Sequence, residues 1–286
     1  MKGVFNILAT PFDEQGRIDD ESLQSLVEFQ IKAGAAGLTI LGIMGEVAKL
    51  SDSERDHVTR VVLEQVNGRI PVVVNTTHTG TRVVIEISQR VAAMGAAGIM
   101  LAPPTNLRNL DSVADFYRSV AAAVKIPVVV QDEPVTTGVI MPASFLAGLG
   151  LPYIKLEEAP VPQKLSRIRE QAPDAQIFGG LGGQYFLEEL ERGAVGTMTG
   201  FAFTEILVSI YTDFTAGRHA EARATFYTHM PLIRYEGQAG VGLAIRKEIL
   251  RRRGAIRCAA IRAPGMRLDA QALREIDSVL GYVGLG

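Results

Sequence analysis

Eight short runs of apolar and β-branched residues, separated by stretches with helical periodicity, restrict the fold of this chain more than any other feature. Runs of this length that stay apolar throughout are typical of strands buried on both faces, as in parallel sheets. The expected strands are Val4–Thr10, Gly37–Gly42, Pro71–Thr77, Gly98–Ala102, Pro127–Gln131, Tyr153–Leu156, Gln176–Gly180 and Val195–Thr199. The clearest helices between them are expected at Glu21–Ala33, Ser53–Gln65 and Thr81–Met94.

This alternation favours a closed (β/α)8 barrel, because eight such units occupy ~210 residues whereas an open doubly wound sheet commonly stops at five or six strands. A repeat of Gly-Ala-Ala-Gly at Gly34–Gly37 and Gly95–Gly98 supports repeated units. After Phe214 the strand signal ends, and helical patterns continue at His219–Met230, Ala239–Arg253 and Asp269–Tyr282. We therefore predict an α/β fold, a TIM barrel over residues 1–217 with a C-terminal helical extension over residues 218–286 packed on it.

Charge and cysteine content narrow the class of partner. The 286 residues carry 29 basic and 31 acidic side chains, for a formal net charge of −2. Because this balance creates no general attraction for nucleic acids or anionic membranes, we expect a small-molecule partner. The single cysteine, Cys258, excludes an intrachain disulfide and fits a reducing cytoplasm, where we expect the protein to act. The longest uncharged stretch, Pro134–Ile154, contains three prolines, so we do not expect it to cross a membrane.

The strongest candidates for chemistry lie on the sixth expected strand. Active sites of such barrels form where the strands end and the loops begin. Alternation along Tyr153–Leu156 places Lys155 and Glu157 on one face. If this face is the barrel interior, burial disfavours the charged amine and makes Lys155 a candidate for imine formation with a keto acid. The alternative is a lysine that reaches solvent and pairs with Glu157 or Glu158.

The loops after the second and third expected strands offer binding groups. Backbone amides around Met44, Gly45 and Glu46 could bind a substrate carboxylate, or the glycines of Gly42–Glu46 could simply permit the turn. His78 either contacts substrate or only orders its loop by hydrogen bonding. The four histidines of the chain are scattered, so we expect no histidine-based metal site.

Three further strand ends carry possible ligand-binding residues. Gln131 and Asp132 end the fifth expected strand at the barrel rim, and Thr199 and Gly200 end the eighth, where a hydroxyl and an open backbone could approach a ligand. The glycine-rich stretch Gly179–Gly183 follows the seventh. A dinucleotide fingerprint belongs after the first strand with an acid ~20 residues further on, so we interpret this stretch as a tight turn close to a ligand.

Several of these segments resemble one known family. Thr10–Asp13, Gly42-x-x-Gly45-Glu46, strand-six Lys155 and the helical tail resemble the dihydrodipicolinate synthase and N-acetylneuraminate lyase family over essentially the whole chain. The resemblance implies a (β/α)8 barrel, a homotetramer and an imine between Lys155 and the C2 carbonyl of a 2-keto acid. Such chemistry requires no metal, flavin or nicotinamide.

The chain departs from the synthase pattern at informative positions. The family's strand-five tyrosine, its proton relay, corresponds to Gln131, and its arginine after strand five corresponds to Thr136. The hydroxyl pair of the strand-two loop corresponds to Ile43 and Met44. Because an amide side chain does not titrate, Gln131 cannot replace the phenol, and we expect no dihydrodipicolinate synthase activity.

A narrower group within the family, the L-2-keto-3-deoxyarabonate dehydratases, resembles the chain more closely. The shared segments are Thr76–Arg82, Val130–Pro134, Lys155–Glu157, Met198–Gly200, Pro231–Glu236 and Gly254–Cys258. The resemblance implies dehydration of a 2-keto-3-deoxy sugar acid. The imine on Lys155 would act as electron sink and Glu157 as base, while Gln131 would bind the substrate or orient Glu157.

Two alternatives remain. A pyruvate-dependent aldolase would use the same imine to break the C3–C4 bond, and a non-enzymatic relative would only bind the ligand. The missing tyrosine disfavours the aldolase, and the presence of both Lys155 and Glu157 disfavours the binding protein. We therefore predict a cytoplasmic, homotetrameric lyase that dehydrates a sugar-derived keto acid.

Overall fold

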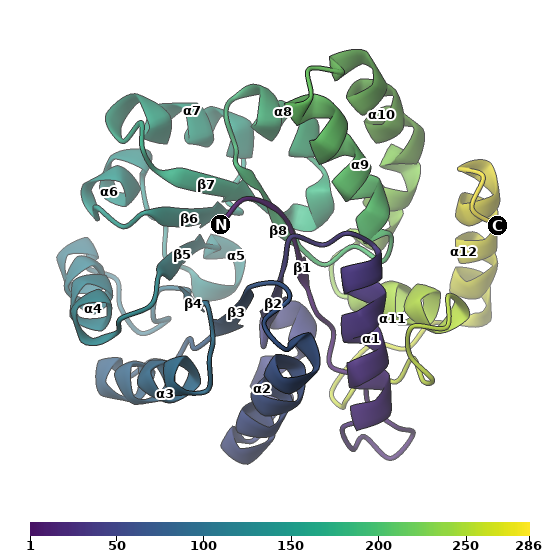
Figure 1. The fold of residues 1–286 in the computed structure, drawn as a ribbon, viewed down its shortest axis with the longest axis horizontal. Coiled ribbons are helices and arrows are strands. Elements are labelled where there is room, and N and C mark those ends of the chain that lie inside the picture. The colour runs from purple at the N-terminus through teal and green to yellow at the C-terminus, as the bar shows by residue number, and fades with distance from the viewer.

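The computed structural model describes residues 1–286 and shows eight parallel strands closed into a barrel with helices around it (Figure 1). The strands are β1 (Gly3–Ile7), β2 (Gly37–Ile40), β3 (Val72–Asn75), β4 (Gly98–Leu101), β5 (Val128–Asp132), β6 (Tyr153–Leu156), β7 (Gln176–Gly179) and β8 (Gly196–Thr199). Each strand pairs with the next, and β8 pairs with β1, so the sheet has no open edge. The predicted (β/α)8 barrel is confirmed.

The helices that follow the strands form the outer ring in Figure 1. They are α1 (Asp20–Lys32), α2 (Asp52–Val66), α3 (Thr81–Ala93), α4 (Leu110–Ala123), α6 (Ala143–Gly148), α7 (Val161–Gln171), α8 (Phe186–Glu191) and α9 (Thr204–Thr215), whereas the short α5 (Pro134–Thr137) follows β5 directly and lies inside the ring. Side chains at their starts satisfy free backbone amides: Asp19 accepts from the first turn of α1, and Ser51 with Glu54 forms a capping box on α2. Short 3₁₀ turns lie at η1 (Ile43–Gly45), η2 (Val47–Lys49) and η3 (Leu181–Gly183).

Three helices follow the barrel, namely α10 (His219–Glu236), α11 (Gly242–Arg252) and α12 (Ala270–Tyr282). α10 packs against α9, α11 and α12, and α12 lies at the outer edge of the molecule (Figure 1). α10 continues through Pro231, past the end expected at Met230, because Leu232 and Ile233 are buried and their packing compensates for the hydrogen bond that proline removes. No helix combines the length and the apolar character needed to cross a lipid bilayer.

The packing inside the barrel shows which strand residues face its interior. A cluster of six buried side chains fills this space: Phe5, Val73, Met100, Val129, Phe178 and Met198. Tyr153 packs against this cluster. Because strand side chains alternate, the residues two positions further along, such as Gln131 and Lys155, face the same interior nearer to the carboxyl ends of the strands.

The expected strands at Val4–Thr10 and Pro71–Thr77 are longer than β1 and β3. The last residues of these two runs lie outside the sheet, because they belong to the loops that follow the carboxyl ends of the strands. Thr10, for example, donates through Oγ1 to the carbonyl of Gly45 in the β2 loop at 2.7 Å.

Candidate active site

The three residues predicted to be catalytic meet inside the barrel. Gln131 on β5 lies directly opposite Lys155 on β6 in the sheet register. The Nζ atom of Lys155 lies 2.7 Å from Oε2 of Glu157, and Nε2 of Gln131 donates to the same oxygen at 2.7 Å. Lys155 is only 1% exposed. An amine, a carboxylate and an amide therefore form one connected cluster, and the solvent-exposed lysine considered from the sequence is not what the structure shows.

Glu157 occupies the rim side of this cluster. Its side chain is 13% exposed, and its backbone amide donates to the carbonyl of Asp132 at 2.9 Å. A Cβ atom on Gly180, at the end of β7, would lie 2.7 Å from Cγ of Glu157. The glycine-rich turn predicted to approach a ligand therefore makes room for the Glu157 side chain, which stands between Lys155 and the solvent.

The charges of this cluster depend on one shared contact. A buried ammonium group is costly unless it is paired and hydrogen-bonded, and Glu157 provides that partner for Lys155. Transfer of one proton from Nζ to Oε2 would leave a neutral amine, which can attack a carbonyl carbon, beside a protonated carboxyl group, which can later donate that proton. The geometry thus suits imine formation followed by proton transfer.

Asp132 lies next to Gln131 in the chain but points to the opposite face of β5. Its Oδ2 atom is 2.6 Å from Nζ of Lys164 on α7, and Lys164 also contacts Glu158. Burial raises the pKa of Asp132 to about 6, although Lys164 opposes this effect. The position of Asp132 at the end of the strand agrees with the sequence, but its side chain belongs to an ion cluster outside the barrel.

The β2 loop departs from the predicted carboxylate site in part. The amides of Gly45 and Glu46 donate to the carbonyls of Gly42 and Ile43, at 2.9 and 3.0 Å, within η1. These amides are therefore already engaged, which corrects the expectation for Gly45 and Glu46. Met44 is partly buried in η1, and its amide, as one of the first in a helical turn, has no partner within that turn.

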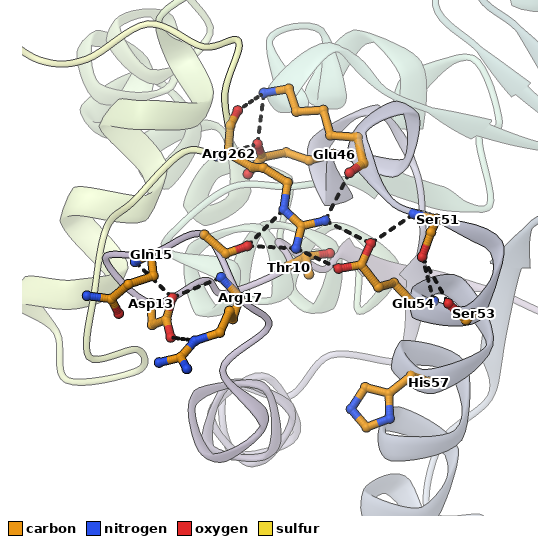
Figure 2. A network of polar contacts seen from close by, with 12 residues as sticks. Thr10, Asp13, Gln15, Arg17, Glu46, Ser51, Ser53, Glu54, His57 and Arg262 are labelled. Carbon is orange, nitrogen blue, oxygen red and sulfur yellow. Dashed lines mark hydrogen bonds and ion pairs between the residues drawn. The ribbon is translucent and has the colours of Figure 1, made fainter.

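Glu46 has a structural role instead of the predicted substrate contact. Its Oε1 atom accepts from Nζ of Lys247 at 2.6 Å, and its Oε2 atom accepts from Nζ of Lys49 at 2.9 Å and from the amide of Arg262 at 3.1 Å. Figure 2 shows Glu46 beside Arg262, whose guanidinium also donates to Glu54 at 2.7 Å. Because both carboxylate oxygens are occupied, Glu46 joins the β2 loop to the C-terminal extension.

His78 and Thr199 lie outside the cluster. His78 is exposed in the loop after β3, where Nδ1 accepts from the amide of Gly80 at 3.1 Å, which is the loop-ordering role considered from the sequence. Thr199 pairs in register with Asn6, and Asn6 donates to Thr204 of α9 at 2.8 Å. The Thr199 side chain shares this outer face, so the expected hydroxyl contact with a ligand is corrected, whereas Gly200 faces the interior.

Arg246 lies next to the end of β8 and was not among the residues predicted from the sequence. It lies on α11, is 5% exposed, and donates through Nε to Oε1 of Glu236 at 2.5 Å. A Cβ atom on Gly200 would lie 2.3 Å from its Nη1 atom. In the sequence, Arg246 follows the apolar residues Ala244 and Ile245. This pattern indicates that the arginine is buried, but it does not reveal which strand the side chain contacts.

Comparison with known proteins identifies the class to which this fold and cluster belong. Residues 1–282 match the model described as the Dihydrodipicolinate synthetase family. Together with the closed barrel and its strand-six lysine, the match defines a (β/α)8-barrel lyase. The chain belongs to the dihydrodipicolinate synthetase family.

Individual relatives within this family bear different names. The chain is 33% identical over 290 residues to L-2-keto-3-deoxyarabonate dehydratase of Azospirillum brasilense, with 97% of this chain and 93% of that protein covered. It is 32% identical over 233 residues to a DapA-like lyase of Rhizobium meliloti described as uncharacterized, covering 78% and 76%. A crystal structure of dihydrodipicolinate synthase from Rhodopseudomonas palustris matches with a TM-score of 0.93 and 34% identity over 99% of this chain and 97% of that one.

Proposed function

We propose that this protein dehydrates a 2-keto-3-deoxy sugar acid, such as L-2-keto-3-deoxyarabonate, through an imine on Lys155. The observation that carries the proposal is the shared oxygen of Glu157, which lies 2.7 Å from both the Lys155 amine and the Gln131 amide. The groups for imine formation and for proton removal are thus in direct contact, and no tyrosine takes part in this cluster. The dehydratase relative, which aligns over 97% of this chain, supports the same reaction.

In the proposed reaction, the neutral amine of Lys155 attacks the C2 carbonyl, and loss of water forms the iminium ion. The positive nitrogen acidifies the C3 proton, which the carboxylate of Glu157 removes. The resulting enamine expels the C4 hydroxyl, which leaves as water after Glu157 returns the proton. Hydrolysis of the imine then releases the dehydrated keto acid and restores the amine. Gln131 orients Glu157 through the hydrogen bond between them.

Gln131 also separates dehydration from the other reactions of the family. Aldol cleavage or condensation at C3 requires a group that transfers a proton to or from the oxygen of the aldehyde partner. The family resemblance assigns this task to a tyrosine at the position of Gln131. An amide does not titrate. Glu157 is the titratable group in contact with Lys155, and the C3 carbon of an imine on Lys155 is two bonds from the imine nitrogen. Proton removal at C3 is therefore the step that this cluster suits best.

The decisive experiment measures products. Purified protein is incubated with a panel of 2-keto-3-deoxy sugar acids, and mass spectrometry distinguishes a product lighter by one water from released pyruvate. We expect water loss, and no condensation of pyruvate with aspartate semialdehyde. Lys155→Arg is the control, because its delocalised guanidinium cannot form the imine. Pyruvate release, or formation of the condensation product, would contradict the proposal.

A trapping experiment separates an enzyme from a protein that only binds the keto acid. Sodium borohydride reduces an imine to a stable amine, so incubation with pyruvate should leave a carboxyethyl group, which is pyruvate without its carbonyl oxygen, on the peptide that contains Lys155. An unlabelled Lys155 peptide would eliminate the imine mechanism.

A further inference from the structure

Three residues of β8 and α8 carry four buried oxygen atoms that have no hydrogen-bond partner. Glu189 of α8 is fully buried, and both oxygens of its carboxyl group lack a partner. The same holds for Oγ1 of Thr197 on β8 and for Oε2 of Glu188. A buried polar group without a partner is costly, so this carboxyl group needs a physical explanation.

The carboxyl group of Glu189 occupies the space that a side chain on Gly179 would fill. Phe178 belongs to the cluster inside the barrel, so the next residue, Gly179, faces outward. A Cβ atom on Gly179 would lie only 1.7 Å from Oε2 of Glu189. Thr197 pairs in register with Gly179, and its side chain therefore shares this outer face. Glycine at the end of β7 thus admits a carboxyl group from α8 to the back of the sheet.

The following glycine faces the proposed base. Gly180 points inward, and a Cβ atom there would lie 2.7 Å from Cγ of Glu157. Two consecutive glycines therefore separate Glu189, outside the barrel, from Glu157, inside it. A displacement of this strand end would move the backbone against which Glu157 packs.

No cation pairs with Glu189. The elements packed against α8 are α7, α9, α10 and β8, and neither α9 nor β8 contains a basic side chain. The basic side chains of α7 and α10 are exposed or have other partners. Arg169 of α7, for example, donates to the carbonyl of Gly193 at 3.4 Å, and Arg223 of α10 pairs with Glu191 at 2.8 Å.

The surroundings of Glu189 favour its protonated form. Burial raises the pKa of Glu189 well above its ordinary value, and the charges of Glu188 and Glu157 act in the same direction. The backbone amide of Gly180 opposes this shift. A neutral carboxyl group avoids the cost of a buried, unpaired charge.

We propose that Glu189 is a neutral positioning residue that holds the strand end Gly179–Gly180 against Glu157, so that the proposed base keeps its place beside Lys155. The inference rests on the proposed function for the role of Glu157. Because Glu189 carries no charge, it fills the space behind β7 without opposing the ionisation of Glu157.

Infrared difference spectroscopy of the full-length protein tests the protonation state without any substrate. The C=O stretch of a protonated carboxyl group is separate from the bands of ionised carboxylates. At pH 8, where Asp132 with its pKa of about 6 is ionised, we expect this band in the unmodified protein and its loss in Glu189→Gln. Glu191→Gln, at the exposed end of the same helix, is the matched control and should keep the band. Loss of an ionised carboxylate band in Glu189→Gln would show that Glu189 is charged, which would overturn the inference.

Deuterium exchange at C3 of pyruvate tests the positioning role. This exchange in D2O, followed by nuclear magnetic resonance, requires the imine and a base but no dehydration. Glu189→Leu keeps most of the volume but removes the polar group that faces the Gly180 amide. We expect its maximal exchange rate to fall about 10- to 100-fold, the usual effect of misplacing a reacting group, with half-saturation by pyruvate and the borohydride-trapped imine on Lys155 unchanged. Glu189→Gln and Glu191→Gln should exchange as the unmodified protein does.

The pH dependence of the exchange gives a second readout. Replacing a neutral group by a neutral amide leaves the proton affinity of Glu157 unchanged, so the profile of Glu189→Gln should coincide with that of the unmodified protein. A profile shifted to lower pH would overturn the inference, because it would show that Glu189 is an anion that acts on Glu157.

A second variant covers the case in which Glu189→Leu does not fold, as circular dichroism can verify. The methyl group of Gly179→Ala would displace the Glu189 carboxyl group, and we expect the same slower exchange. Normal exchange by the folded variant would overturn this inference alone. Absence of exchange by the unmodified protein would refute the proposed role of Glu157, and this inference with it.

Discussion

Glu157 contacts both Lys155 and Gln131 through one oxygen, so its charge and its position are set by the same two contacts. A substitution that keeps the shape of this side chain but removes its charge therefore separates imine formation from proton transfer. Such a substitution tests directly whether Glu157 is the base that removes the C3 proton.

We expect Glu157→Gln to retain the borohydride-trapped imine on Lys155 and to lower kcat by about 10²- to 10⁴-fold, the usual contribution of a positioned base. Mass mapping measures the first property and the product assay the second. Glu158→Gln is the control, because Glu158 contacts Lys164 outside the barrel. Normal turnover by Glu157→Gln would show that another group removes the C3 proton.

The buried Asp132 predicts a pH dependence of stability. Its pKa is raised from 3.8 to about 6, chiefly by burial, with Lys164 acting in the opposite direction. Between these two values the folded protein keeps a proton that the unfolded chain has lost, so this group's contribution to stability falls as pH rises. At pH 7 the loss amounts to about 3 kcal/mol at most, because one pKa unit corresponds to about 1.4 kcal/mol.

Asp132→Asn cannot titrate, so its free energy of unfolding relative to the unmodified protein should increase between pH 4 and pH 7. Urea unfolding at several pH values in this window measures the difference. Asp174→Asn, which removes an exposed carboxyl group in the loop before β7, serves as the control. A difference that stays constant across the window would contradict the prediction.

At the scale of elements, a buried ion pair joins the β2 loop to α11. Glu46 and Lys247 lie 2.6 Å apart with both side chains almost fully buried. Burial lowers the pKa of Lys247, and Glu46 opposes that shift. The two partners differ in their remaining contacts: Glu46 keeps Lys49 and the Arg262 amide, whereas Lys247 keeps the carbonyl of Ala260 and the face of the Phe12 ring but no other anion.

We therefore expect Glu46→Gln to lower the free energy of unfolding by about 3–5 kcal/mol, because it leaves a buried cation without its anion. Lys247→Met should cost less, since Glu46 retains other donors. The double variant should cost less than the two single variants combined. Urea unfolding of all four proteins gives the coupling energy, and additive effects would show that this pair does not tie the loop to the helix.

For the whole molecule, we predict a homotetramer, as the family resemblance implies. Two large apolar side chains stand exposed after β5, Val135 at 88% and Ile140 at 64% exposure, and their burial between subunits would be favourable. Sedimentation at micromolar concentration should give about 123 kDa, four times the chain mass of 30.8 kDa. A species near the mass of one chain would contradict this assembly.

The strands and their faces were predictable because both follow from local patterns. A buried parallel strand must be apolar on two faces, so each run marked one strand of the barrel. Alternation along Tyr153–Leu156 was enough to place Lys155 and Glu157 on one face. The predicted ends of the strands were less accurate. Thr10, for example, belongs to the expected strand Val4–Thr10, but it lies outside the sheet and donates a hydrogen bond to Gly45 in the loop after β2.

Contacts between distant segments depended on how the barrel closes and how its extension folds back. Gln131 meets Glu157 because of the register between β5 and β6. Glu46 pairs with Lys247, 201 residues further along, and Arg246 lies against Gly200 at the end of β8 only because the C-terminal extension folds back to the barrel. A periodic pattern specifies which face of an element is apolar, but it does not specify which charged group of another element will lie against that face.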